Sequence, residues 1–189
     1  MSHRQSVDRA RIEEFLKHLG KRFRKPGRVY LVGGTTLVFE GLREQTLDID
    51  VVLGVAASDH GEIIQAVREL KDTLSVNVKE ASPGDFIPLP SGYENRHIFV
   101  GRFGMLDVLH FDLYSTALSK IERGRMQDFD DVLALLRAGR LEWNALVDCF
   151  KEILPQMGKH SLKQNPARFE QNFRTLEALW QSPDSASQE

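Results

Sequence analysis

The sequence YLVGGTT at residues 30–36, followed by LDIDV at residues 47–51, carries the clearest structural and chemical signal in this chain. An apolar run ends in paired glycines, and after a short helix-like segment a second apolar run carries two aspartates one residue apart. Glycines at a strand-to-helix turn let the backbone approach a ligand closely, and the helix that follows presents free N–H groups that favour an anion. This order predicts a phosphate-binding turn that faces a pair of metal-binding carboxylates.

The two aspartates, Asp48 and Asp50, lie in the second expected strand, residues 47–53, and alternation directs both to one face of it. Their Cα atoms are expected roughly 7 Å apart, at about 3.3 Å per residue. That separation lets both carboxylates bind one Mg²⁺ or share two ions. An exposed edge strand whose acids pair with Arg43 is the alternative interpretation. The residues that alternate with the acids are expected to face the core: Leu47, Ile49 and Val51.

The glycine turn is expected to contact phosphate through Gly33, Gly34 and Thr35, with Thr36 as a further hydroxyl donor. A plain turn would produce the same short pattern, so the phosphate-binding interpretation depends on the two aspartates that follow. The chain has no Gly-Lys-Ser/Thr sequence after the glycines, which excludes a Walker-type phosphate loop.

Composition sets mild bounds on the class of protein. A length of 189 residues fits one domain, or one domain with a helical appendage, and the net charge of −2 gives no overall attraction to nucleic acid or to an anionic membrane. Cys149 is the single cysteine, which excludes a disulfide framework and a cysteine-based zinc site within one chain. The first residues lack an apolar signal core and no apolar run is long enough to span a bilayer, so we expect a cytoplasmic location without a membrane.

The rest of the chain alternates helices and strands before it becomes wholly helical. An apolar stripe predicts a helix over residues 7–23, and a Pro/Gly-rich loop is expected over residues 81–92. The other expected strands span residues 28–32, 74–78, 96–103 and 105–111, and the other expected helices fall within residues 35–41, 59–70, 115–136, 142–154 and 166–180.

The glycine turn, the acid pair, and the residues Arg43 and Thr46 between them resemble the signature of the polymerase-beta-like nucleotidyltransferase superfamily. The similarity is closest to small bacterial families that include the AbiEii-type and MenT-type toxins of toxin–antitoxin systems. The superfamily usually has a serine in this turn, whereas this chain has Gly-Gly-Thr, which keeps a hydroxyl.

The resemblance implies an α+β nucleotidyltransferase fold, a small mixed β-sheet flanked by helices with a helical C-terminal extension. We expect a nucleotidyltransferase core over residues 1–139 that includes the N-terminal helix and a helical extension over residues 140–181. The polar residues 182–189 are expected to form a disordered tail.

A third carboxylate is expected on a later strand, and Asp107 fits that position. Asp112 is the competing candidate and is equally a candidate helix cap. The resemblance also implies that Lys120, Arg43 and Asp128 contact the nucleotide. Ion pairs that lock two helices together are an alternative role for Lys120, Arg125, Asp128 and Asp131.

The activity implied is Mg²⁺- or Mn²⁺-dependent transfer of a nucleoside monophosphate from a nucleoside triphosphate. The expected metal ligands are Asp48, Asp50 and Asp107. The acceptor implied is RNA such as tRNA, or a protein, and a toxin with an antitoxin partner is one biological setting. A non-catalytic binding module with this fold and a small-molecule nucleotidyltransferase are the alternatives. The base used and the oligomeric state are left open.

Overall fold

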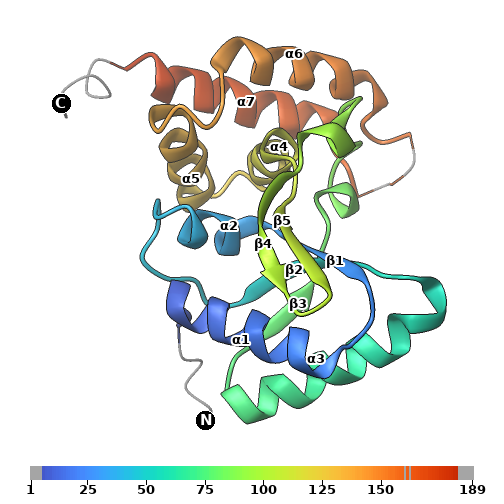
Figure 1. Ribbon diagram of the computed structural model, residues 1–189. Helices are drawn as coiled ribbons and strands as arrows, with labels where there is room; N and C mark the ends of the chain where they lie inside the picture. Colours follow the sequence, from blue (N-terminus) through green and yellow to red (C-terminus); the bar gives the residue numbers. More distant parts are fainter. Residues whose placement is uncertain (1–5, 160, 162, 183–189) are drawn as a thin grey trace. The chain divides into compact units, whose positions relative to one another are not determined.

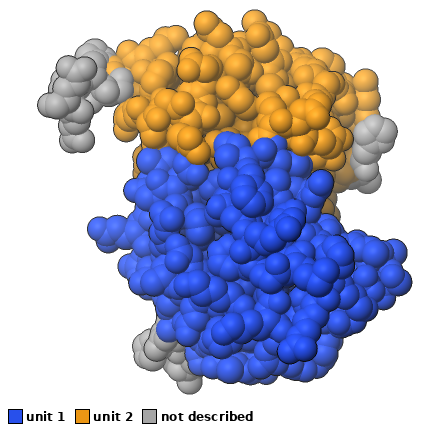
Figure 2. Space-filling view, viewed as in Figure 1, with its two compact units in different colours: residues 1–82, 97–111 blue, residues 83–96, 112–189 orange. Residues whose placement is uncertain are grey.

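The computed structural model describes residues 6–159, 161 and 163–182 (Figure 1). The chain divides into two compact units, which Figure 2 colours separately. Unit 1 contains residues 1–82 and 97–111, and unit 2 contains residues 83–96 and 112–189.

Unit 1 is built on a five-stranded mixed sheet with the strand order β3-β2-β1-β5-β4. The strand β1 is antiparallel to β2 and parallel to β5. The expected α+β fold with a small mixed sheet is therefore confirmed. The strands are β1 (Gly27–Leu31), β2 (Ile49–Gly54), β3 (Val78–Glu80), β4 (Ile98–Phe103) and β5 (Leu106–His110).

Three helices accompany the sheet in unit 1, and α1 and α3 pack together over one of its faces (Figure 1). They are α1 (Arg9–Arg22), α2 (Gly33–Phe39) and α3 (His60–Leu74). Short 3₁₀ turns at Ala57–Asp59, Pro83–Asp85, Tyr93–Arg96 and Leu154–Gln156 complete the connections in the two units.

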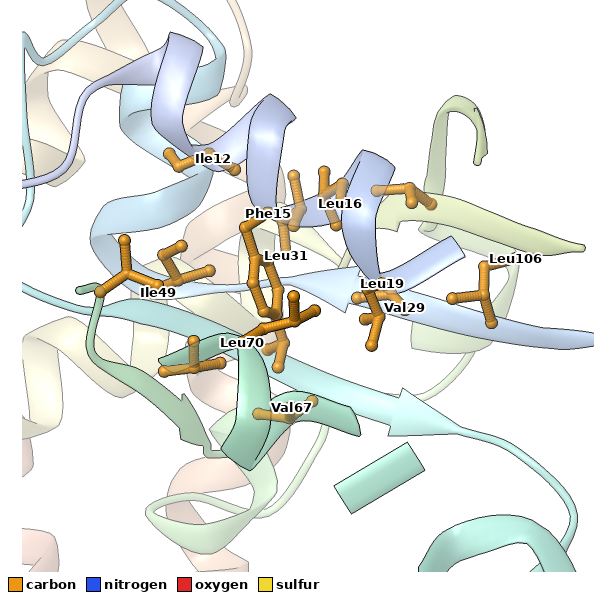
Figure 3. Close-up of a cluster of buried hydrophobic side chains, with 14 of the residues drawn as sticks. Ile12, Phe15, Leu16, Leu19, Val29, Leu31, Ile49, Val67, Leu70 and Leu106 are labelled. Carbon is orange, nitrogen blue, oxygen red and sulfur yellow. The ribbon is translucent and has the colours of Figure 1, made fainter. Parts of the chain in front are cut away.

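The core of unit 1 lies between α1, α3 and the sheet (Figure 3). The apolar stripe predicted for the first helix is buried there, and the alternate residues Val29 and Leu31 of β1 face it. Burying a side chain of this size stabilises the fold by about 1.5–3 kcal/mol. Because alternate residues of a strand point to opposite faces, Arg28 of β1, Asp50 of β2 and Asp107 of β5 are directed away from this core.

The second strand and the helix before it begin at different residues from those predicted. The strand β2 begins at Ile49, and Leu47 is 55% exposed instead of facing the core. The helix α2 begins at Gly33, so the glycines form its first turn and do not precede it. The third strand is later than expected because α3 continues to Leu74 and ends on Ser75 in the left-handed conformation.

Unit 2 is helical among the residues that the structure describes. Its helices are α4 (Leu113–Arg123), α5 (Met126–Arg137), α6 (Trp143–Ile153) and α7 (Pro166–Trp180). The rings of Phe150 and Phe173 stack at 3.9 Å between centroids, which joins α6 to α7. The amide of Asn172 donates to the carbonyl groups of Ile121 and Glu122 at 2.8 and 3.1 Å, which holds the end of α4 against α7.

This division differs from the core and extension expected from the sequence. The structure groups α4 and α5 with α6 and α7, whereas residues 1–139 were expected to form one core. Residues 183–189 of the expected tail lie outside the described residues. Within the described chain, no helix combines the length and the apolar character needed to cross a membrane.

The close approach of α1 to the β4–β5 turn requires a glycine at position 20, and substitution of Gly20 tests this packing. A Cβ atom at Gly20 would collide with the backbone carbonyl of Phe103. We expect Gly20→Ala to lower the free energy of unfolding by about 2 kcal/mol or more, as overpacking does in a rigid site.

Gly61→Ala is the matched control, because Gly61 also lies in a helix and a Cβ atom there meets nothing within 4 Å. It should leave stability unchanged or raise it slightly. Urea unfolding curves of both variants measure this difference in stability. Equal unfolding midpoints for Gly20→Ala and Gly61→Ala would contradict the close approach of α1 to the turn.

Candidate functional site

The glycine turn and the acid strand are in direct contact within unit 1. Gly33 has φ of +57°, and a Cβ atom there would lie 3.0 Å from Oδ2 of Asp50. The backbone N–H of Val32 donates to the carbonyl of Asp50 at 3.2 Å, which keeps the two stretches side by side. Glycine therefore meets two demands at once, a left-handed backbone and space for a carboxylate. The two sequence motifs form one site.

The hydroxyl of Thr35 fastens the first turn of α2 to the start of the acid strand. Its Oγ1 accepts a hydrogen bond from the N–H of Asp50 at 2.8 Å and donates to the carbonyl of Asp48 at 3.3 Å. The side chain is fully buried. Thr35 was predicted to contact phosphate, but the structure uses its hydroxyl to position the two aspartates.

Arg43 and Thr46 lie against the second glycine. A Cβ atom at Gly34 would come 2.7 Å from Oγ1 of Thr46 and 3.4 Å from Nη1 of Arg43. Thr46 is held in turn by two backbone hydrogen bonds with Val7, at 2.7 and 2.9 Å. The loop between the two motifs thus brings a guanidinium group beside the glycine turn, where its positive charge favours an anion. Arg43 also lines a groove of 490 Å³ next to the start of α1.

Two residues of the third strand region bind Asp48, and the sequence did not reveal them. The amide of Asn77 donates to Oδ1 of Asp48, and Nζ of Lys79 lies 2.5 Å from Oδ2. These partners are 29 and 31 residues away along the chain, and only the parallel pairing of β2 with β3 brings them close. Asp48 is held in place on both of its oxygens, and its side chain remains 16% exposed.

The donor set fits a hard divalent cation that is shared with a phosphate ligand. Among the described residues, no group of three or more His, Cys, Asp or Glu side chains is placed to hold a metal ion. The carboxylate of Asp50 lies beside the glycine turn, and the carboxylate of Asp48, two residues earlier, is bound by Asn77 and Lys79. Mg²⁺ is commonly bound by one or two carboxylates together with water and substrate phosphates, in contrast to ions that need a complete protein cage.

The structure does not bring Asp107 to the acid pair, and the prediction that it completes this site is wrong. Asp107 of β5 is level with Arg28 of β1, whereas Asp50 is level with Val32, four residues further along β1. At about 3.3 Å per residue this places Asp107 about 13 Å from Asp50 along the sheet. Arg102 binds its two oxygens at 2.7 and 3.2 Å.

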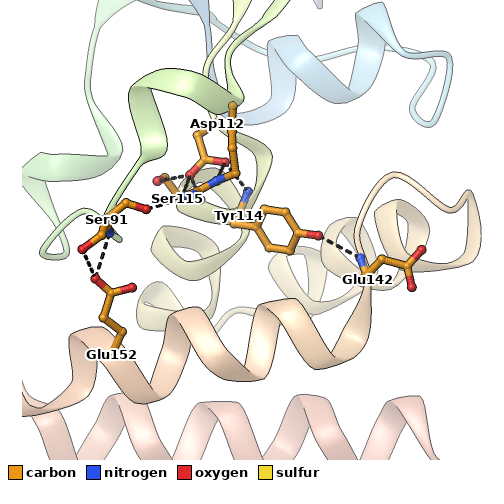
Figure 4. A network of polar contacts seen from close by, with 7 residues as sticks. Ser91, Asp112, Tyr114, Ser115, Glu142 and Glu152 are labelled. Atoms are coloured by element: carbon orange, nitrogen blue, oxygen red, sulfur yellow. Dashed lines mark hydrogen bonds and ion pairs between the residues drawn. The ribbon is translucent and has the colours of Figure 1, made fainter.

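Asp112, the competing candidate, is a helix cap in unit 2 (Figure 4). Its carboxylate accepts hydrogen bonds from the N–H groups of Tyr114 and Ser115 at 3.3 and 3.2 Å, and from the hydroxyl of Ser115 at 2.6 Å. Arg96 binds both carboxylate oxygens at 2.9 Å. The side chain is fully buried, and the helix-cap interpretation is confirmed.

Lys120 takes part in a buried ion-pair cluster between α4 and α5. Its Nζ lies 2.6 Å from Oδ2 of Asp131 and 3.7 Å from Oδ1 of Asp128, and it is 4% exposed. Arg123 also binds Asp128, whose carboxylate accepts the N–H of Arg125 at 3.2 Å. The ion-pair role is confirmed for Lys120, Asp128 and Asp131, and contact of Lys120 or Asp128 with a nucleotide stays a prediction.

The helix of the glycine turn has a second buried anchor, which the sequence did not reveal. Nδ1 of His110 lies 3.3 Å from Oγ1 of Thr36, and Nε2 lies 2.8 Å from Oε1 of Glu40. His110 is 2% exposed and Thr36 is fully buried, so this Thr-His-Glu array joins α2 to the end of β5 and offers no accessible nucleophile. It excludes the interpretation of Thr36 as a phosphate donor.

Comparison with known proteins places this geometry in a family. A family described as "Nucleotidyltransferase of unknown function (DUF6036)" matches residues 10–178, which contain both sequence motifs. Neither a curated protein nor a solved structure matches the chain.

Substitution of Thr35 tests whether its hydroxyl positions the acid pair. In Thr35→Val the N–H of Asp50 and the carbonyl of Asp48 lose their partner, and each buried polar group left unpaired costs about 1–3 kcal/mol. We expect lower stability in urea unfolding and weaker Mn²⁺ binding by calorimetry. Thr35→Ser keeps the hydroxyl and should retain most of both. If the serine variant loses as much as the valine variant, the hydroxyl is not the cause.

The pH dependence of stability tests the cluster in unit 2. Burial by itself raises the pKa of Asp128, but the hydrogen bond from Arg123 and the charge of Lys120 outweigh it and hold this pKa below its usual value. A lowered pKa in the folded protein adds stability above the unfolded pKa of about 3.9, and that stability is lost as pH falls through the folded pKa.

We therefore expect the free energy of unfolding to fall below about pH 4 less steeply in Arg123→Gln than in the wild type. Chemical unfolding at a series of pH values measures this difference. Arg137→Gln, in the exposed last turn of α5, serves as the control. Equal slopes in all three proteins would contradict the role of Arg123.

Proposed function

The chain belongs to this family of nucleotidyltransferases, and we propose that it moves a nucleoside monophosphate from a nucleoside triphosphate to an acceptor hydroxyl at the acid pair of unit 1. The observation that carries the proposal is the contact of Gly33 with the carboxylate of Asp50. It joins a turn suited to phosphate and a strand suited to a metal ion in a single site. Neither motif alone would support the proposal.

The glycine turn and Arg43 would bind the triphosphate. Gly33 and Gly34 lie in the first turn of α2, whose backbone N–H groups have no partner within the helix and would donate to phosphate oxygens. The guanidinium group of Arg43 beside Gly34 adds a positive charge at the same place. Thr35 would act as a positioning residue, because its hydroxyl ties this turn to the acid strand.

Asp48 and Asp50 would hold Mg²⁺ or Mn²⁺ together with the phosphates. When bound, such an ion neutralises phosphate charge and stabilises the pyrophosphate that leaves. The two aspartates orient the triphosphate by fixing this charge, while Asn77 and Lys79 keep the carboxylate of Asp48 in position. The acceptor oxygen forms a bond to the α-phosphorus, and the bond between the α-phosphorus and the oxygen that bridges it to the β-phosphorus breaks. The acceptor proton passes to solvent or to a neighbouring carboxylate.

The acceptor we propose is RNA such as tRNA, with a protein as the second candidate. This part of the proposal rests on the resemblance to toxin-like nucleotidyltransferases, as does a toxin–antitoxin setting. The net charge of −2 adds no support for RNA. A binding module without activity would keep the fold but need neither carboxylate, and the chain has both Asp48 and Asp50.

Substitution of the acid pair is the direct test of activity. We expect Asp48→Asn and Asp50→Asn each to lower nucleotide transfer by about 100-fold or more, because each removes a metal ligand. The assay incubates the protein with each α-labelled nucleoside triphosphate and Mg²⁺, with total RNA and protein extract as acceptors. Separating RNA, protein and small molecules afterwards identifies the class of acceptor, and a labelled small molecule would favour small-molecule nucleotidylation.

Asp72→Asn is the matched control, since Asp72 is exposed near the end of α3 in the same unit. It should leave transfer unchanged. If the wild type neither transfers label nor binds nucleotide in a metal-dependent way, the proposal is overturned. Transfer by the Asp48→Asn and Asp50→Asn variants at the wild-type rate would also overturn it.

A further inference from the structure

A recess of 400 Å³ lies on the sheet of unit 1, away from the acid pair. The side chains that line it include two arginines, an aromatic ring, a thioether and one carboxylate: Arg28, Arg102, Tyr30, Met105 and Asp107. Gly54 contributes to the lining without a side chain, and a Cβ atom there would lie 3.1 Å from Cε2 of Tyr30. The recess is thus a space whose walls carry charge and an aromatic surface.

The recess and the acid pair share one face of the sheet. On β2, the residues that alternate with the buried Ile49, Val51 and Leu53 all point away from the core. Asp50 and Gly54 belong to this set and lie four residues apart, which corresponds to about 13 Å along the strand. Tyr30, paired with Val52, lies between them. A ligand extended along this face would reach from the recess to the acids.

The recess carries a net positive charge. Arg102 binds Asp107 with two hydrogen bonds and remains 67% exposed, and Arg28 is exposed beside them. The hydrogen bond from Arg102 and the charge of Arg28 hold the pKa of Asp107 below its usual value, so all three groups are ionised at neutral pH. Two guanidinium groups against one carboxylate leave one positive charge. Guanidinium groups match the geometry of phosphate oxygens.

The aromatic side of the recess is held rigidly. The ring of Tyr30 lies 4.6 Å from the ring of His97 and 5.9 Å from the ring of Phe111, measured between centroids. Tyr30 itself is half-buried, so part of its ring remains accessible. The side chain of Met105 is 49% exposed nearby. A fixed ring beside cationic groups is the combination that binds nucleotides of single strands, through base stacking and phosphate contacts.

We propose that this recess binds one nucleotide unit of a single-stranded nucleic acid acceptor, with its phosphate at Arg28 and Arg102 and its base on Tyr30. The strand then follows this face of the sheet and presents its terminal hydroxyl at the acid pair. Its role as acceptor rests on the proposed function, whereas the binding of a nucleotide unit does not. A free nucleotide has the same chemistry, and the experiment below separates the two sources.

The test measures binding of a short fluorescent single-stranded RNA by anisotropy, in EDTA and at several salt concentrations. We expect Arg28→Gln and Arg102→Gln each to weaken binding about tenfold and to reduce the salt slope by about one. Tyr30→Leu should weaken binding by a similar factor with an unchanged salt slope, because a stacked base is lost and no charge is removed.

Arg174→Gln is the matched control. Arg174 is also 67% exposed and paired with a carboxylate, Glu170, but it lies on α7 in unit 2. It should bind RNA like the wild type. Urea unfolding of each variant confirms that it is folded. If the recess variants bind like the control, the assignment of the recess is overturned.

Competition identifies the source of the nucleotide unit. Unlabelled single strands should displace the probe far better than AMP, inorganic phosphate or duplex RNA. Equal displacement by AMP or by phosphate would overturn the strand assignment, and so would label transfer confined to protein without any RNA binding.

Steady-state transfer then separates this inference from the proposed function. Arg28→Gln should raise the KM for the RNA acceptor with little change in kcat, and Asp48→Asn should lose transfer but keep RNA binding. RNA binding without transfer in the wild type would overturn the proposed function alone. Transfer with an unchanged KM in Arg28→Gln would overturn the recess alone.

Discussion

The hydroxyl of Thr35 lies between the two halves of the candidate site, and the rest of the site depends on it. It accepts a hydrogen bond from the N–H of Asp50 and donates one to the carbonyl of Asp48. These two bonds fix the start of the acid strand to the first turn of α2. The missing Cβ of Gly33 completes the fit by making space for the carboxylate of Asp50. The glycine turn and the carboxylate pair therefore keep one fixed geometry, which the proposed in-line transfer would require.

The two faces of the sheet of unit 1 have different roles: one packs in the core, and the other carries the candidate site residues. One face buries the apolar residues of β1, β2 and β5 against α1 and α3. The other face carries the acids at one end and the cationic recess at the other. Because side chains alternate along each strand, the same short strands supply both faces. Substitutions on this second face can thus change the proposed binding or transfer without removing the core.

The buried charged residues of unit 2 are explained by ion pairs between α4 and α5, without a ligand. Lys120, Asp128 and Asp131 are nearly fully buried, and each of them is ion-paired within the cluster. Breaking such a pair leaves a buried charge without a partner, which is far more costly than losing a surface pair. Their pattern along the sequence is explained by the joining of α4 to α5.

The sequence by itself determined the α+β class, the amphipathic helices, and the pairing of a glycine turn with Asp48 and Asp50, because these depend on local periodicity and short spacing. The sequence predicted that Asp107 lies on the same face of the sheet as Asp50, but not how far along the sheet the two residues lie from each other. Alternation defines the face, whereas the register depends on pairing between strands that are distant in the sequence. Only the tertiary structure revealed Lys79 and Asn77 at Asp48, and the role of Thr35. Contacts across some 30 residues of chain leave no periodic trace in the sequence.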